Sequence, residues 1–319
     1  MTPDQVTYLV FGIVILLAIT FDLGLLSKRS AKISIKKALW QTVFWVLLAI
    51  AFGGFVWYEE GQNASLEYIS AYLMEWSLSI DNIFVFILIF SFFKIRGDHV
   101  ARALLIGILM AIVFRVIFIT IGIALVERFY WILYFFGAFL VYTGIKIFTV
   151  KHEDEFDPEK NPVYRFLKKY FRIIPHDVSG QIFIKKDGKR FYTNMFLVIV
   201  LLATTDIVFA LDSIPAVFAI TQDKLIIYTS NTFAVLGLRS LFFLLKGAVT
   251  KFEYLQQGIA IVLIFIGAKM LVDYFDIHVP IYISLMVIVI CLSGSIAYSL
   301  QVVKQRKKKK KLNLKNQEM

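Results

Sequence analysis

Two stretches of the sequence, Met74-Glu-Trp-Ser-Leu-Ser-Ile-Asp-Asn82 and Thr204-Thr-Asp-Ile-Val-Phe-Ala-Leu-Asp-Ser-Ile-Pro215, place carboxylic acids inside long apolar runs. The four acids are Glu75, Asp81, Asp206 and Asp212. A charge at the centre of a membrane helix costs about 2.5–3.5 kcal/mol on insertion scales, so acids kept there usually face a bundle interior and serve a function. These stretches therefore predict membrane-spanning helices that carry a site.

The rest of the chain fits a lipid environment. Of the 319 residues, 59% are hydrophobic, and the mean hydropathy is +0.74. Because about 20 apolar residues span a bilayer, the apolar runs predict an all-α polytopic membrane protein with about nine transmembrane helices. The predicted spans are residues 6–26, 37–58, 66–93, 101–126, 129–149, 194–220, 225–246, 254–275 and 280–302.

The distribution of basic residues predicts the orientation. The odd-numbered loops and the tail are rich in Lys and Arg, whereas the even-numbered loops are poor in them. Basic loops stay in the cytoplasm, so we expect the N-terminus outside and the C-terminus inside. The net charge of +11 is then explained by topology, and no nucleic-acid partner is expected. The chain is one transmembrane domain over 1–319, with a cytoplasmic loop at about 150–193 and a basic cytoplasmic tail at 303–319.

The long loop contains one short pattern of its own. Residues 180–192 alternate around Asp187-Gly188, which is typical of a small β-hairpin.

Both acid pairs have a spacing of six residues. On a regular helix this is about 9 Å of rise and about 120° of rotation, so one ion cannot bind both acids of a pair. Either the helices open locally, or the ligands come from both helices. Pro215 follows Asp212 by three residues and predicts a local opening in the second stretch.

The same order of residues recurs after each pair. Asp81 is followed by Arg115 and Gly144-Ile-Lys146, and Asp212 is followed by Arg239 and Gly267-Ala-Lys269. Because the two stretches cross the membrane in opposite directions, we predict an inverted repeat of two three-helix units, spans 3–5 and 6–8. Glu75 and Asp212 should then lie nearer the outside, and Asp81 and Asp206 nearer the cytoplasm. The two lysines are expected to extend to the membrane interface.

Arg115, Arg239 and Asp22 are further charged residues within the spans. Arg115 and Arg239 either pair with acids to hold the bundle together or balance the charge of an ion site. The four carboxylates outnumber these two arginines, which favours ion binding by the acids. Asp22 either extends an ion path towards the cytoplasm or caps a helix end beside Lys28.

The segments Glu75–Phe86 and Asp206–Val217 resemble the two signature motifs of the TerC family. The long middle loop and the nine-span outline resemble its Alx-like branch, which is grouped with the LysE exporter superfamily. The resemblance implies a bacterial inner-membrane protein linked to manganese export or tellurite resistance. Carried over by motif, the positions that it implies for the metal are Glu75, Asp81, Asn82, Asp206, Asp212 and Ser213.

The ligand chemistry narrows the function independently. Carboxylate, amide and hydroxyl oxygens favour hard ions such as Mn²⁺, Mg²⁺ or Ca²⁺, and do not separate them. The resemblance favours Mn²⁺. The chain has no Gly-x4-Gly-Lys-Ser/Thr motif, so transport would use a gradient, with protons as counter-ion. We therefore expect a divalent-cation exporter, not an enzyme, with no cofactor.

One alternative comes from another class of protein. It is a membrane-protein assembly factor or a tellurite-stress scaffold without transport, which would use the basic fifth loop and tail. A carboxylate-rich site repels the tellurite oxyanion itself. The oligomeric state stays open.

Overall fold

The computed structural model describes residues 3–27, 34–95, 97–149, 161–174, 180–186, 189–246, 254–275 and 277–317. Within these helical ranges, the side chains of residues 3–5, 18, 19, 21–27, 81, 84, 98 and 307–317 lie outside the described part, and these include Asp22 and Asp81.

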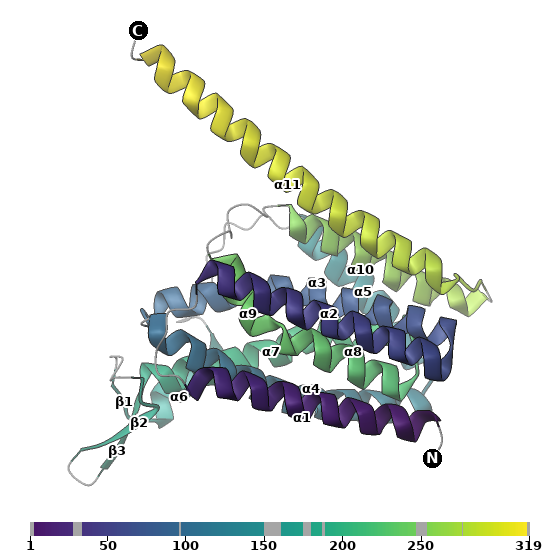
Figure 1. Ribbon diagram of the computed structural model, residues 1–319, viewed down its shortest axis with the longest axis horizontal. Coiled ribbons are helices and arrows are strands. Elements are labelled where there is room, and N and C mark those ends of the chain that lie inside the picture. The colour runs from purple at the N-terminus through teal and green to yellow at the C-terminus, as the bar shows by residue number, and fades with distance from the viewer. Residues whose placement is uncertain are drawn as a thin grey trace.

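The chain is a bundle of long helices, which confirms the predicted all-α polytopic membrane protein (Figure 1). The long helices are α1 (Pro3–Ser27), α2 (Ile35–Glu60), α3 (Gln62–Phe92), α4 (Gly97–Arg128), α5 (Ile132–Thr149), α7 (Asn194–Phe218), α8 (Lys224–Leu236), α9 (Leu238–Lys246), α10 (Leu255–Val272) and α11 (Ile281–Gln317). A 3₁₀ turn, η3 (Asp273–Phe275), follows α10.

Among the described residues, 8 segments are long and apolar enough to cross a membrane. They correspond to predicted spans 2 to 9, with α8 and α9 together forming the seventh. In α1, whose side chains are described only in part, the apolar stretch among the described residues is Val6–Leu17. The predicted first span therefore stays a prediction.

The structure departs from the sequence prediction in where a span is interrupted. Helix α7 is continuous through Pro215 and ends three residues later, at Phe218. Pro215 cannot donate a hydrogen bond to the carbonyl of Leu211, yet the last turn stays helical and closes with Ala219 N donating to Pro215 O at 3.1 Å. The interruption falls instead at Gly237, between α8 and α9. Glycine favours such a break because it is a poor helix former.

Helices α5 and α10 pack along their glycines. A Cβ atom at Gly144 would lie 2.8 Å from the carbonyl oxygen of Ala260, and one at Gly267 would lie 2.5 Å from that of Gly137. The contacts run in opposite sequence order along the two helices, so α5 and α10 are antiparallel. The last helices of two inverted repeats would pair in this way; the repeat itself stays a prediction.

The long loop contains α6 (Pro162–Tyr170) and a small sheet with strand order β1-β3-β2. The strands are β1 (Ile173–Ile174), β2 (Phe183–Lys186) and β3 (Lys189–Thr193). Strands β2 and β3 are antiparallel, with Lys186 paired to Lys189. This confirms the predicted hairpin, although Asp187 and Gly188 themselves lie outside the described residues.

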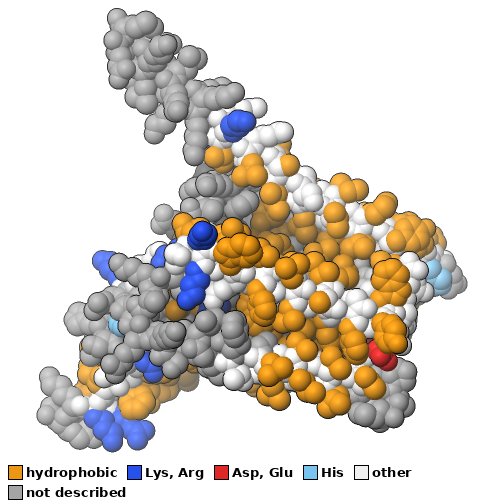
Figure 2. Space-filling view, viewed as in Figure 1, with side chains coloured by type: hydrophobic (Ala, Val, Ile, Leu, Met, Phe, Trp, Pro, Cys, Tyr) orange, Lys and Arg blue, Asp and Glu red, His pale blue; other side chains and the backbone are white. Residues whose placement is uncertain are grey.

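The surface is divided by chemistry. In Figure 2 hydrophobic side chains cover the face of the bundle, and most of the visible Lys and Arg gather at the end where α6 and the strands lie. Large apolar side chains such as Trp40 and Leu16 are about two-thirds exposed, as expected for contact with lipid. Helix α1 begins at the opposite end of the bundle from the strands, as the predicted topology requires (Figure 1). The direction of insertion stays a prediction.

Candidate functional site

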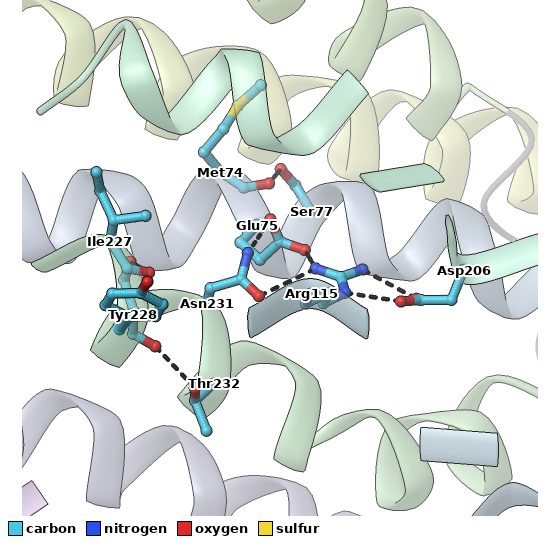
Figure 3. A network of polar contacts seen from close by, with 10 residues as sticks. Met74, Glu75, Ser77, Arg115, Asp206, Ile227, Tyr228, Asn231 and Thr232 are labelled. Atoms are coloured by element: carbon cyan, nitrogen blue, oxygen red, sulfur yellow. Dashed lines mark hydrogen bonds and ion pairs between the residues drawn. The ribbon is translucent and has the colours of Figure 1, made fainter. Parts of the chain in front are cut away.

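A guanidinium group lies at the centre of the buried charges (Figure 3). Arg115 of α4 donates from Nε to Asp206 Oδ2 at 2.8 Å and from Nη2 to Asp206 Oδ1 at 2.9 Å. Its Nη1 donates to Glu75 Oε1. The exposed fractions are 2% for Arg115, 0% for Glu75 and 1% for Asp206. One arginine thus joins an acid of α3 to an acid of α7 through charge-assisted hydrogen bonds.

The fourth member of the network is Asn231 of α8, which was not among the predicted site residues. Its Nδ2 donates to Glu75 Oε2 at 3.0 Å, and its Oδ1 lies 3.4 Å from Arg115 Nη1 (Figure 3). Asn231 is 2% exposed. The signal in the sequence is a side-chain amide inside an apolar run, since a buried amide needs hydrogen-bond partners.

The network does not balance its charge. Two carboxylates face one guanidinium, which leaves one negative charge among the four side chains. Breaking a buried ion pair by removing one partner costs about 3–5 kcal/mol, because the remaining charge stays buried. The four side chains therefore depend on one another.

Asp212 lies apart from this network. It is half-buried on α7, and its Oδ1 accepts a hydrogen bond from Thr143 Oγ1 of α5 at 3.2 Å. Six residues on a continuous helix turn the two acids of α7 to different directions, as the spacing predicts. Thr143 was not identified from the sequence either.

The remaining predicted ligands are only partly described. Asn82 is 2% exposed, and Ser213 is 1% exposed, with no hydrogen-bond partner for its Oγ among the side chains and backbone that the structure describes. The side chains of Asp81 and Asp22 lie outside the described part. Arg239, at the start of α9 directly after the break, is 4% exposed.

The arrangement differs from the predicted two levels of carboxylates. The prediction separated Glu75 from Asp206, whereas in the structure both bind the same guanidinium. The long side chain of Arg115 makes this possible by reaching both acids. Among the described residues, no group of three or more His, Cys, Asp or Glu side chains is placed to hold a metal ion.

A separate polar cavity of about 330 Å³ lies at one end of the bundle, at the start of α3 and the end of α10. Glu67, Thr221, Lys269 and Asp273 are among the residues that line it. Glu67 Oε2 accepts a hydrogen bond from Thr221 Oγ1 at 2.5 Å, and Lys269 Nζ donates to Ser284 Oγ at 3.2 Å. Lys146 is exposed, and its extension to the membrane interface stays a prediction. Lys269 is partly buried and lines the cavity.

The fold and the buried ion pairs define a polytopic integral membrane protein with charged side chains in its helix bundle. Residues 60–308 match the family described as the integral membrane protein TerC family, and the chain belongs to this family.

Curated relatives cover most of the chain. An uncharacterised membrane protein of Myxococcus xanthus is 42% identical over 88% of this chain and 88% of its own. Proteins named "Putative membrane-bound redox modulator Alx" are 39% identical in Salmonella typhi, over 94% of this chain and 95% of the relative, and 40% identical in Escherichia coli, over 87% and 89%. No solved structure matches the chain.

Proposed function

We propose that this protein is a carrier of divalent metal cations that exports Mn²⁺ across the bacterial inner membrane, and that it is not an enzyme. The observation that carries the proposal is the convergence of Glu75, Asp206 and Asn231, from three different helices, on one buried point. Membrane helices rarely contain acids, and those that do usually use them in ion or proton pathways.

The donor atoms select the class of ion. Carboxylate oxygens of Glu75 and Asp206 and the amide oxygen of Asn231 are hard ligands, which suit Mn²⁺, Mg²⁺ and Ca²⁺. Membership of the TerC family supports Mn²⁺ through the resemblance described above. Asp212, with Thr143, and the motif residues Asp81, Asn82 and Ser213 supply further oxygens along the path.

Protons are the proposed counter-ion. A carboxylate holds either a proton or a metal ion, so the same acids can carry both in opposite directions. Exchange driven by a proton gradient also fits a chain that contains no ATP-binding motif. In the proposed orientation the N-terminus lies outside, and α6 and the strands face the cytoplasm.

The name of the Alx relatives refers to redox modulation. This chain contains a single cysteine, Cys291, so it cannot form a disulfide within itself. The buried acids therefore support ion transport more strongly than a redox function.

Flux of Mn²⁺ into proteoliposomes with an imposed pH gradient tests the proposal. Glu75→Gln, Asp206→Asn, Asp81→Asn and Asp212→Asn should each abolish or strongly reduce the flux. Glu127→Gln is a matched control, because Glu127 is 58% exposed and pairs with Lys224 at the surface. Equal flux in the wild type and all four variants, at equal protein content, would overturn the proposal.

A further inference from the structure

The four oxygens around Arg115 are arranged as a cation's ligands. Glu75 Oε1, Asp206 Oδ1, Asp206 Oδ2 and Asn231 Oδ1 all face nitrogens of the same guanidinium. Carboxylate and amide oxygens converging on one positive group is also the ligand set that a hard metal ion takes. The guanidinium therefore lies where a bound cation would lie.

From this geometry we infer that Arg115 is a tethered substitute for the transported ion: it occupies the cation site when the ion is absent and must leave for the ion to bind. The inference rests on the proposed function, and it assigns the regulation of that same site. It makes Arg115 a competitor of the ion, in contrast to an arginine that only holds helices together.

Charge supports the exchange. With Arg115 in place, the two acids keep one negative charge between them. With a divalent cation in its place, the charges of Glu75 and Asp206 are fully balanced. An empty site without either cation would leave two carboxylates unpaired in the bundle, which is strongly unfavourable. The arginine thus gives the protein a state without metal in which these acids remain paired.

The geometry also indicates which contacts would change. Asp206 binds the guanidinium through both of its carboxylate oxygens. Glu75 binds it through Oε1 only, and its Oε2 accepts a hydrogen bond from Asn231 Nδ2 at 3.0 Å. When Arg115 leaves, Asn231 still holds Glu75. Asn231 is thus the positioning residue that keeps one carboxylate oriented for the ion.

A tethered competitor has a defined effect on affinity. If the guanidinium occupies the site for about nine-tenths of the time, the apparent affinity for the ion falls about tenfold. Replacing Arg115 should therefore tighten binding, whereas the loss of a purely structural arginine should disorder the acids and weaken it.

The test is Mn²⁺ binding to the purified protein in detergent, followed by the electron paramagnetic resonance signal of free Mn²⁺. We expect Arg115→Met to bind about tenfold more tightly than the wild type. Arg115→Lys should lie between the two, because an ammonium cannot reproduce the side-on pairing with Asp206. Lys224→Met removes a surface cation, 53% exposed, and should leave binding unchanged. In flux assays Arg115→Met should lower the KM, because the ion binds more tightly without a competitor. It should also lower the maximal rate, because no guanidinium then displaces the bound ion.

Equal or weaker binding in Arg115→Met would overturn the inference. If that variant does not fold, Arg115→Lys decides, and equal or weaker binding in it has the same meaning. The two proposals fail separately. A wild type that transports through Glu75 and Asp206, but whose Arg115 variants bind no more tightly, retains the function and loses the tethered cation. If Arg115→Met binds Mn²⁺ more tightly, if adding Glu75→Gln removes that gain, and if no flux is measured, then the cation site is retained and the transport proposal is lost.

Discussion

Arg115 and Lys269 are both cations of membrane helices with acids around them, but their surroundings differ. Arg115 makes ion pairs with Glu75 and Asp206 and is 2% exposed. Lys269 lines a cavity of about 330 Å³ together with Glu67 and Asp273, and its described hydrogen bond goes to a serine. A cavity of that size holds several water molecules. Burial requires direct pairing at Arg115, whereas water can replace pairing at Lys269.

The largest effect is expected at the buried arginine. Arg115→Ala leaves two carboxylates buried without a cation and should lower the free energy of unfolding by about 3–5 kcal/mol in metal-free buffer. Thermal or denaturant unfolding in detergent with a chelator measures this. A loss below about 1 kcal/mol would show that the network is screened by water, as is expected for the cavity.

The next effect concerns the amide beside the arginine. Asn231→Leu removes the donor to Glu75 Oε2 and leaves a buried acceptor unsatisfied, which should cost about 1–3 kcal/mol. The same unfolding experiment measures it, with Thr232→Val on the partly buried neighbouring position as the control. Equal losses in both variants would remove the special role of Asn231.

A smaller effect is expected at the second acid of α7. Thr143→Val removes the hydrogen bond to the half-buried Asp212 at 3.2 Å and should cost about 1 kcal/mol. This loss of stability lies between the losses expected for Arg115 and Asn231 in the buried network and the loss expected for Lys269 in the cavity. A loss as large as that of Arg115→Ala would mean that Asp212 is as tightly held as Glu75.

The smallest effect is expected in the cavity. Lys269→Met keeps the length of the side chain, and the acids near it can bind water, so stability should change by less than about 1 kcal/mol. The unfolding free energy at low and moderate salt measures this. A larger loss would show that Lys269 is paired as firmly as Arg115, and the contrast between the two regions would disappear.

The sequence predicted the features that depend on local pattern. The apolar runs placed eight of the spans, the alternation around Asp187-Gly188 located the hairpin, and the acids inside apolar runs marked α3 and α7. Spacing along a helix gives depth and rotation, but not how neighbouring helices cross. For this reason the sharing of Arg115 by Glu75 and Asp206 was not foreseen.

The partners of the site were also hidden. Asn231 and Thr143 are ordinary polar residues until α8 and α5 bring them to Glu75 and Asp212. The break at Gly237 rather than at Pro215 has a similar cause. A proline in the last turn of a helix removes one backbone hydrogen bond without necessarily ending the helix, and the effect of a glycine depends on what packs around it.

The contact between α5 and α10 has a mechanical consequence. At Gly144 and Gly267 backbone atoms of the two helices approach closely, and the side chains of Ile264 and Val141 pack against the same glycines. Helices packed this closely cannot slide past each other without first separating, so we expect α5 and α10 to move as one rigid pair. Asp212 of α7 is hydrogen-bonded to this pair through Thr143 of α5, so any movement of α7 relative to α5 and α10 would strain or break that bond.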